Sequence, residues 1–365
     1  MRIEVAEHRH EQALRDLCRQ SPMPGWIRLA FGRDPDFFHA LDIQGKLNQV
    51  IIAVEGERLV GMGCRSVRPA WVNGQRTDIG YLGGLRLIPE IRGSGAMARA
   101  YAVCKTLHTQ RPVPAYLSTI IEENTAAVDL LTSGRAGLPH YVDRGRYFTY
   151  AINLNRHPRR RRPCTLVIRR GGEIPLERLT AFLSQCGSQR QFFPAIDSAD
   201  FGTDYLRGLR LEDFRVATDE NGEVAGVAAV WDQHSFKQNI VEGYGLPVRV
   251  FRPVINGALR LTGFRALPMP GKTLNMLYVA FCCVRENDPL TMRALLEQIY
   301  ADCHLGDHHF LVLGFHEHDP LRVAVDSFLA FRYTSRLYLV CWDDGLDFVK
   351  RLDPDRIPHI EVATL

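Results

Sequence analysis

The sequence lacks the features that mark membrane, secreted and metal-binding chains. No uninterrupted apolar run approaches the roughly 20 residues that cross a bilayer, and the start Met1-Arg2-Ile3-Glu4 has no apolar signal region. The nine cysteines are an odd number and show no paired metal-ligand spacing. We therefore expect a protein of the reducing cytoplasm, with no membrane contact and no bound metal.

A large excess of charge of one sign is also missing. The formal net charge is only +4 over 365 residues, which does not imply a polyanionic partner. The local exception is the run from Arg159 to Arg162, which we interpret as a solvated linker rather than an anionic docking site. Nucleic-acid binding is therefore not expected.

What the chain does have is the composition and length of a globular protein with two cores. Apolar residues make up 46% of the sequence and charged residues 24%, values that are typical of soluble domains. A chain of 365 residues is too long for one ordinary compact domain and suits two.

The order of apolar patterns is the same in both halves. In the first half, the segments 48–54, 59–67 and 77–87 predict an antiparallel meander, and 21–45 predicts no regular structure. A helix (96–108), a buried strand (115–121), a short helix (125–132) and a strand (146–154) follow. Residues 165–342 repeat this order, which favours duplication of one α/β unit.

A glycine-rich turn joins the third strand to the helix at residue 96. Gly83-Gly84 interrupts the strand, which indicates a bulge or the close approach of a ligand. The turn exposes backbone N–H groups at the positive end of a helix, as a diphosphate site does, although an ordinary turn is the alternative. The predicted site comprises Arg92, which adds a charged donor, with Gly93, Ser94, Gly95, Ala96 and Met97.

This segment resembles the pyrophosphate loop of the GNAT superfamily of acyl-CoA-dependent N-acyltransferases. That loop has the form Arg/Gln-x-x-Gly-x-Gly/Ala after a bulged strand. Arg92 and Gly95 fit the form, whereas Met97 stands where the family usually has glycine or alanine. Downstream, Asn124 to Ala127 resembles the second signature of the family, Asn-x-x-Ala at a helix start.

The resemblance implies a coenzyme site. Acetyl-CoA, or another acyl-CoA, would lay its pantetheine arm along the backbone of Leu85 and Leu87, and Asn124 would face the coenzyme. The residue type of Asn124 also suits a helix N-cap, a role that does not exclude the first.

The reaction implied by the resemblance is direct attack of an amine on the thioester. Many family members carry a glutamate base and a tyrosine acid where this chain has Thr119 and Leu131. The remaining candidates for proton transfer are Asp78, Tyr81, His140, Tyr141 and Tyr147, of which we rank Tyr141 first. Each of these side chains also has a purely structural interpretation, because strand tyrosines usually pack.

We therefore expect an α/β protein with two tandem GNAT-like domains. Residues 1–155 would bind the acyl-CoA, 156–163 would form a linker, and 164–365 would be a degenerate copy. The expected function is an N-acetyltransferase that acts on a small-molecule or protein amine. The alternative is a non-catalytic acyl-CoA-binding or regulatory module, which is motivated by Thr119 and Leu131.

The second half is predicted to lack the coenzyme site. Asp288 suits an N-cap and Pro289 a first helical turn, which places a carboxylate where phosphate would bind. The segment from His316 to Asp319 suits polar caps rather than a metal site. The inserted segment 246–266 has apolar residues at helical spacing, and we expect them to pack in the core rather than to contact a membrane.

Overall fold

The computed structural model describes residues 1–22, 27–91, 93–135, 137–155 and 165–365. The predicted linker 156–163 and Arg92 lie outside these described residues. In chain order, the first half contains β1 (Arg2–Val5), α1 (Glu11–Gln20), β2 (Ile27–Gly32), α2 (Phe37–Leu41), β3 (Leu47–Glu55), β4 (Arg58–Val72), β5 (Gln75–Leu87), α3 (Ala96–Gln110), β6 (Tyr116–Ile121), α4 (Thr125–Leu131) and β7 (His140–Asn153).

The second half follows a similar order. Its elements are β8 (Val167–Arg170), α5 (Leu176–Gly187), β9 (Phe214–Thr218), β10 (Val224–Trp231), β11 (Gln238–Tyr244), α6 (Leu246–Leu261), β12 (Met276–Val284), α7 (Pro289–Cys303), β13 (Phe310–His316), β14 (Ala330–Cys341) and α8 (Leu346–Lys350). Relative to the first half, β11 with α6 is inserted and α8 is added, and the described residues contain no counterpart of β2 and α2 between α5 and β9.

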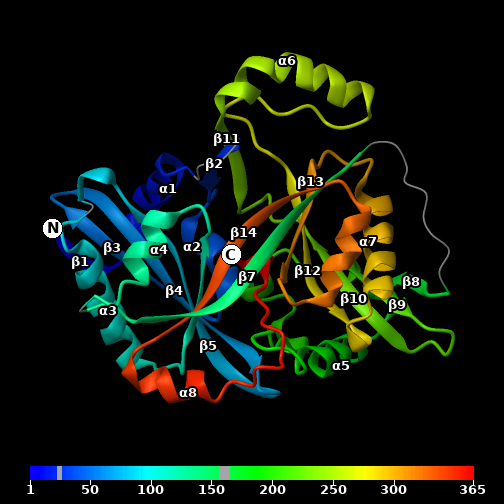
Figure 1. Cartoon of the computed structure of the whole chain (residues 1–365), viewed down its shortest axis with the longest axis horizontal. Helices are drawn as coiled ribbons and strands as arrows, with labels where there is room; N and C mark the ends of the chain where they lie inside the picture. Colours follow the sequence, from blue (N-terminus) through cyan, green and yellow to red (C-terminus); the bar gives the residue numbers. More distant parts are fainter. Residues whose placement is uncertain (23–26, 92, 136, 156–164) are drawn as a thin grey trace.

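One large sheet runs through both halves (Figure 1). Its strand order is β1-β3-β4-β5-β6-β14-β7-β13-β12-β10-β9-β8. The last strand of each half has therefore crossed to the other half, because β14 pairs with β6 and β7 pairs with β13. The two crossed strands also pair with each other, from Ala330↔Ile152 to Cys341↔His140. This exchange joins the two halves into one hydrogen-bonded sheet, and the division at residues 155 and 164 stays a prediction.

The core is likewise shared between the halves. Helix α3 covers a cluster that includes Leu107, Tyr116 and Val340. The largest cluster draws side chains from both halves, among them Leu117 and Trp231. No helix in the described part of the chain is long and apolar enough to cross a membrane.

The stretch 21–45 is more regular than its sequence predicts. It contains β2 and α2, and β2 pairs antiparallel with β11 of the second half, with Phe31 opposite Asn239. These two strands form a small separate sheet. The expectation of irregular structure is wrong because the partner strand lies about 200 residues away, so no local hairpin signal marks it.

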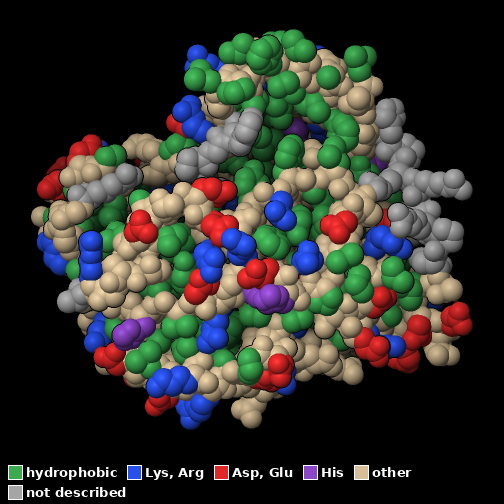
Figure 2. Space-filling view, in the orientation of Figure 1, with side chains coloured by type: hydrophobic (Ala, Val, Ile, Leu, Met, Phe, Trp, Pro, Cys, Tyr) green, Lys and Arg blue, Asp and Glu red, His purple; other side chains and the backbone are tan. Residues whose placement is uncertain are grey.

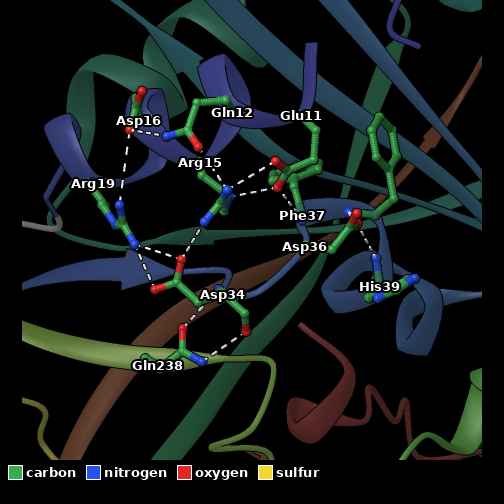
Figure 3. A network of polar contacts seen from close by, with 11 residues as sticks. Glu11, Gln12, Arg15, Asp16, Arg19, Asp34, Asp36, Phe37, His39 and Gln238 are labelled. Atoms are coloured by element: carbon green, nitrogen blue, oxygen red, sulfur yellow. Dashed lines mark hydrogen bonds and ion pairs between the residues drawn. The ribbon is translucent and has the colours of Figure 1, made fainter. Parts of the chain in front are cut away.

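A polar network fixes the end of β2 against α1 and β11 (Figure 3). The Asp34 carboxylate accepts hydrogen bonds from Arg15 at 2.7 Å and from Arg19 at 2.6 Å. Gln238 bonds both main-chain groups of Asp34, at 3.1 and 3.0 Å. Partial burial alone would raise the pKa of Asp34. The two guanidinium groups nevertheless hold that pKa below its usual value. The network positions the loop that follows β2.

Candidate acyl-CoA site

Strands β5 and β6 form a fork. They pair in parallel only at Gly80↔Tyr116 and Tyr81↔Leu117. Beyond Tyr81, β5 continues to Leu87 and keeps its pairing with β4 on the other side. One edge of the β5 backbone is therefore unpaired from residue 82 onward among the residues that the structure describes. An extended chain can add to such an edge through main-chain hydrogen bonds.

The predicted bulge lies in this unpaired part of β5. The register between β4 and β5 shifts between Met62 and Cys64, so Gly84 and Leu85 have no partner on β4. Gly84 has φ +64°, and a Cβ built on it would come within 3.0 Å of Cys64 Sγ. Glycine is required here by both its backbone angle and its contact. Leu85 is exposed and Leu87 is half-buried, so both predicted contacts are accessible.

The turn after β5 ends in a helix start that no side chain caps. Gly95 is the N-cap of α3, with φ +74° and no side-chain hydrogen bond to the first turn. The Ser94 hydroxyl donates to Ile91 O at 2.7 Å, which leaves it turned away from that helix start. The first N–H groups of an α-helix have no acceptor within the helix. A phosphate placed before Ala96 would therefore meet free donors and the positive end of the dipole.

The space around the two glycines is open. Gly93 also has a positive φ, +82°, and a Cβ built on Gly93 or Gly95 meets no atom of the described residues within 4 Å. In the first turn of α3, Ala96 is buried and Met97 is half-buried. The side chain of Met97 packs with the cluster under the helix, so the departure from glycine or alanine at this position does not fill the turn.

Asn124 caps the helix on the other side of the fork. Its Oδ1 accepts a hydrogen bond from Ala127 N at 3.3 Å, which confirms the N-cap interpretation. Its amide nitrogen bonds no other residue among those the structure describes, and the side chain is exposed. The amide group therefore keeps two donors that a bound coenzyme could use.

Two arginines meet at the bulge from different elements. Arg33 follows β2 and Arg86 belongs to β5, and their guanidinium carbons lie 5.5 and 5.6 Å from the centroid of the Phe31 ring. Arg86 donates to Gly84 O at 3.3 Å. Burial lowers the pKa of Arg33, and the charge of Arg86 lowers it further. Neither arginine forms an ion pair with a residue that the structure describes.

A third cation lies close to Arg33. Lys237 is buried, with Nζ 4.6 Å from the centroid of the Tyr278 ring. It donates to main-chain oxygens of Ala363, at 3.3 Å, and Leu365. Burial lowers the pKa of Lys237 well below its ordinary value, and the charge of Arg33 acts in the same direction. These cations were missed at the sequence level, because three elements from both halves bring them together.

Tyr141, the first-ranked catalytic candidate, is engaged by a second tyrosine. Its hydroxyl lies 2.6 Å from that of Tyr101 on α3, and its ring contacts Tyr338 edge to face. Burial raises the pKa of Tyr141 to about 12. The pair lies roughly 8 Å along α3 from its first residue, given a rise of about 1.5 Å per residue. A catalytic role for Tyr141 stays a prediction.

Of the other candidates for proton transfer, one lies at the fork of β5 and β6 and the rest lie elsewhere. Tyr81 places its hydroxyl 3.5 Å from Thr119 Oγ1, across the fork where β5 and β6 part. Tyr147 donates to Gly314 O and Ile360 O and is buried. His140 Nε2 forms a hydrogen bond of 2.7 Å with Asp343 Oδ1, and Asp78 is exposed near the start of β5. Only Tyr81, with Thr119, lies at the fork.

In the second half, a carboxylate caps the helix start that corresponds to the start of α3. Asp288 is the N-cap of α7 and accepts from Leu290 N at 3.1 Å and Thr291 N at 2.9 Å, as predicted, with Pro289 in the first turn. Asp319 caps the next short helix in the same manner. Among the described residues, no three His, Cys, Asp or Glu side chains gather in a way that could hold a metal.

The N-cap of α7 makes a measurable contribution to the free energy of unfolding. We expect Asp288→Ala to lower the free energy of unfolding by about 1 kcal/mol at neutral pH. Partial burial would raise the pKa of Asp288, but the hydrogen bonds from Thr291 hold that pKa below its usual value. The contribution is therefore complete above the unfolded pKa of about 3.9 and is lost as the pH falls through the folded pKa. Denaturant unfolding at pH 7 and at acidic pH measures this, and a difference that stays constant on acidification would contradict it.

We compared the sequence and the structure with those of known proteins. No family model and no curated protein matches the sequence. Among solved structures, Saccharomyces cerevisiae N-myristoyltransferase with bound myristoyl-CoA is similar with a TM-score of 0.59, at 12% identity, over 93% of this chain and 82% of that chain. A GCN5-related N-acetyltransferase from Sphaerobacter thermophilus is similar with a TM-score of 0.51, at 13% identity, over 80% and 79%. Over most of its length, this chain therefore has the tandem GNAT fold that N-myristoyltransferase also has.

Proposed function

We propose that this protein transfers an acyl group, with acetyl as the expected group, from a coenzyme A thioester to an amine. The observation that carries the proposal is the fork of β5 and β6 leading to an uncapped helix start. The diphosphate would bind at Gly93 to Ala96, and the pantetheine arm would extend β5 along Leu87 and Leu85. Similar N-acyltransferase folds support this assignment without fixing the acyl group.

The bulge is then the expected location of the thioester. A pantetheine arm that runs from the turn toward Tyr81 passes Gly84 and Leu85, whose backbone has no partner on β4. Free N–H groups near a thioester oxygen would stabilise the charge that develops during amine attack. The Tyr81 hydroxyl, beside Thr119, would be the nearest protein group to the reacting atoms and could pass a proton to the leaving thiolate.

The cations at the bulge favour an acceptor that carries a carboxylate. Arg33 and Arg86 meet at the Phe31 ring, Arg86 also bonds Gly84 O in the bulge, and no described acidic side chain neutralises them by an ion pair. A half-buried guanidinium without a carboxylate partner binds an anionic ligand more strongly than an exposed one does. The amine acceptor is therefore proposed to be an amino acid or a peptide with a nearby carboxylate.

Release of free coenzyme A from acetyl-CoA, followed with a thiol reagent, tests the reaction. Each amine would be offered with a free carboxylate and with that carboxylate amidated. We expect turnover of the free acid, and Arg86→Gln should raise its KM by about 10- to 100-fold, since a charge-assisted hydrogen bond contributes about 1.5–3 kcal/mol. The amidated acceptor should respond little to the substitution.

A matched control is available on β2. Arg28 is exposed and pairs only loosely with Glu242, at 3.8 Å, so Arg28→Gln should leave KM unchanged. Equal effects of Arg28→Gln and Arg86→Gln would refute the acceptor assignment. Binding of acetyl-CoA without turnover of any amine would instead support the alternative, a non-catalytic acyl-CoA-binding or regulatory module.

A further inference from the structure

Helix α6 turns its apolar face away from the protein. It projects from the body of the molecule above the β2 and β11 pair, and apolar side chains cover its outer surface (Figures 1 and 2). Leu246, Val250, Val254 and Leu261 are 71, 65, 71 and 88% exposed. None of the residues of α6 is buried. The expectation that this segment packs in the core is therefore wrong.

Two polar side chains of α6, Arg252 and Asn256, face inward. Arg252 donates to Pro268 O at 3.0 Å, and Asn256 exchanges two hydrogen bonds with Leu267, at 3.2 and 2.8 Å. These bonds hold the helix against the returning segment that leads to β12. The orientation is thus set by specific contacts, and it presents the apolar residues to whatever lies outside. Such an exposed apolar face marks an interaction surface.

The charge of this segment indicates what kind of partner the apolar face of α6 would contact. Residues 246–272 contain four arginines and one lysine and no aspartate or glutamate. Arg249 and Arg260 are exposed, three turns apart, along one edge of the apolar face. Arginines that border an apolar helix face suit a layer in which apolar chains lie below anionic groups. A second copy of the chain would instead bring the same positive charges together.

We propose that α6 docks in the interfacial layer of an anionic phospholipid membrane. Its outer side chains would enter the boundary between headgroups and acyl chains, and Arg249 and Arg260 would lie among the phosphates. The expectation of no membrane contact was based on the lack of a membrane-spanning run and on core packing of this segment, and the structure does not have that packing. Helix α6 follows β11, which pairs with β2, so docking would hold the Arg33 side of the site near the lipid.

Vesicle flotation tests the docking and does not depend on acyl transfer. The full chain is mixed with vesicles of phosphatidylcholine alone, or of phosphatidylcholine with phosphatidylglycerol. We expect the protein to float with the anionic vesicles and to be released by high salt. Val254→Glu should weaken binding about tenfold or more, because it places a charge where an apolar side chain enters the membrane.

The control variant introduces glutamate at another exposed apolar residue. Leu305 is 76% exposed and lies between α7 and β13, so Leu305→Glu should bind vesicles as the wild type does. Thermal unfolding of both variants should match the wild type, because neither position is buried. The proposal is overturned if the wild type floats with neither vesicle, or if Val254→Glu binds anionic vesicles normally. It is also overturned if Val254→Glu only converts a dimer into a monomer.

Discussion

Gly95→Glu is expected to reduce the affinity for acetyl-CoA by about 100-fold or more, a loss of about 2.7 kcal/mol. The added side chain would start from a position that meets no described atom within 4 Å, and its carboxylate would compete with phosphate for the free N–H groups of α3. Asp288 shows the same competition in the second half, where a carboxylate already bonds the first turn of α7. Calorimetric titration of acetyl-CoA into wild type and variant measures the effect.

A matched control separates lost binding from backbone strain. Gly202 also has a positive φ, +81°, and a Cβ built on it meets nothing within 4 Å. Gly202→Glu therefore adds the same charge and about the same strain, roughly 1–2 kcal/mol, far from the fork in sequence. It should lower the thermal stability as Gly95→Glu does and leave acetyl-CoA binding intact. Equal affinities of Gly95→Glu and wild type would remove the basis for the coenzyme site.

Arg190→Met is expected to lower the free energy of unfolding by about 3–5 kcal/mol. Arg190 is 2% exposed and Asp319 is 1% exposed, and the two form a buried ion pair. Arg190 also donates to Asn287, beside the cap of α7. The ion pair joins the end of α5 to the helix start after β13. Removal of the arginine leaves an uncompensated carboxylate in the core, and denaturant unfolding measures the cost.

Two further variants distinguish the buried charge from lost packing. In Arg190→Met combined with Asp319→Asn, both charges are gone while the amide can still cap the helix, so the double variant should recover about 2 kcal/mol relative to Arg190→Met alone. Lys350→Met removes an exposed ion pair with Asp347 and should change the stability by less than about 0.5 kcal/mol. If the double variant is no more stable than Arg190→Met, the effect comes from packing.

Local sequence patterns determined most of the elements. The periodicity of α3, the meander of β3 to β5, the bulge at Gly84 and the caps at Asn124 and Asp288 depend on neighbouring residues, which the sequence displays directly. The glycine turn before α3 belongs to the same class, because its geometry depends on Gly93 and Gly95 and on the helix that follows. These features were predictable for that reason.

Contacts between distant segments decided the rest. The exchange of β7 and β14, the pairing of β2 with β11, and the meeting of Arg33 with Arg86 at Phe31 join residues far apart in the chain, and no local pattern encodes a long-range partner. The apolar spacing of α6 predicts a helix with an apolar face, but tertiary contacts, among them the hydrogen bonds of Arg252 and Asn256, determine that this face points outward. The sequence by itself thus determined the glycine turn and the helix that follows it. The tertiary structure decided what surrounds the fork of β5 and β6 and which surface the protein presents, because both depend on how the two halves pack.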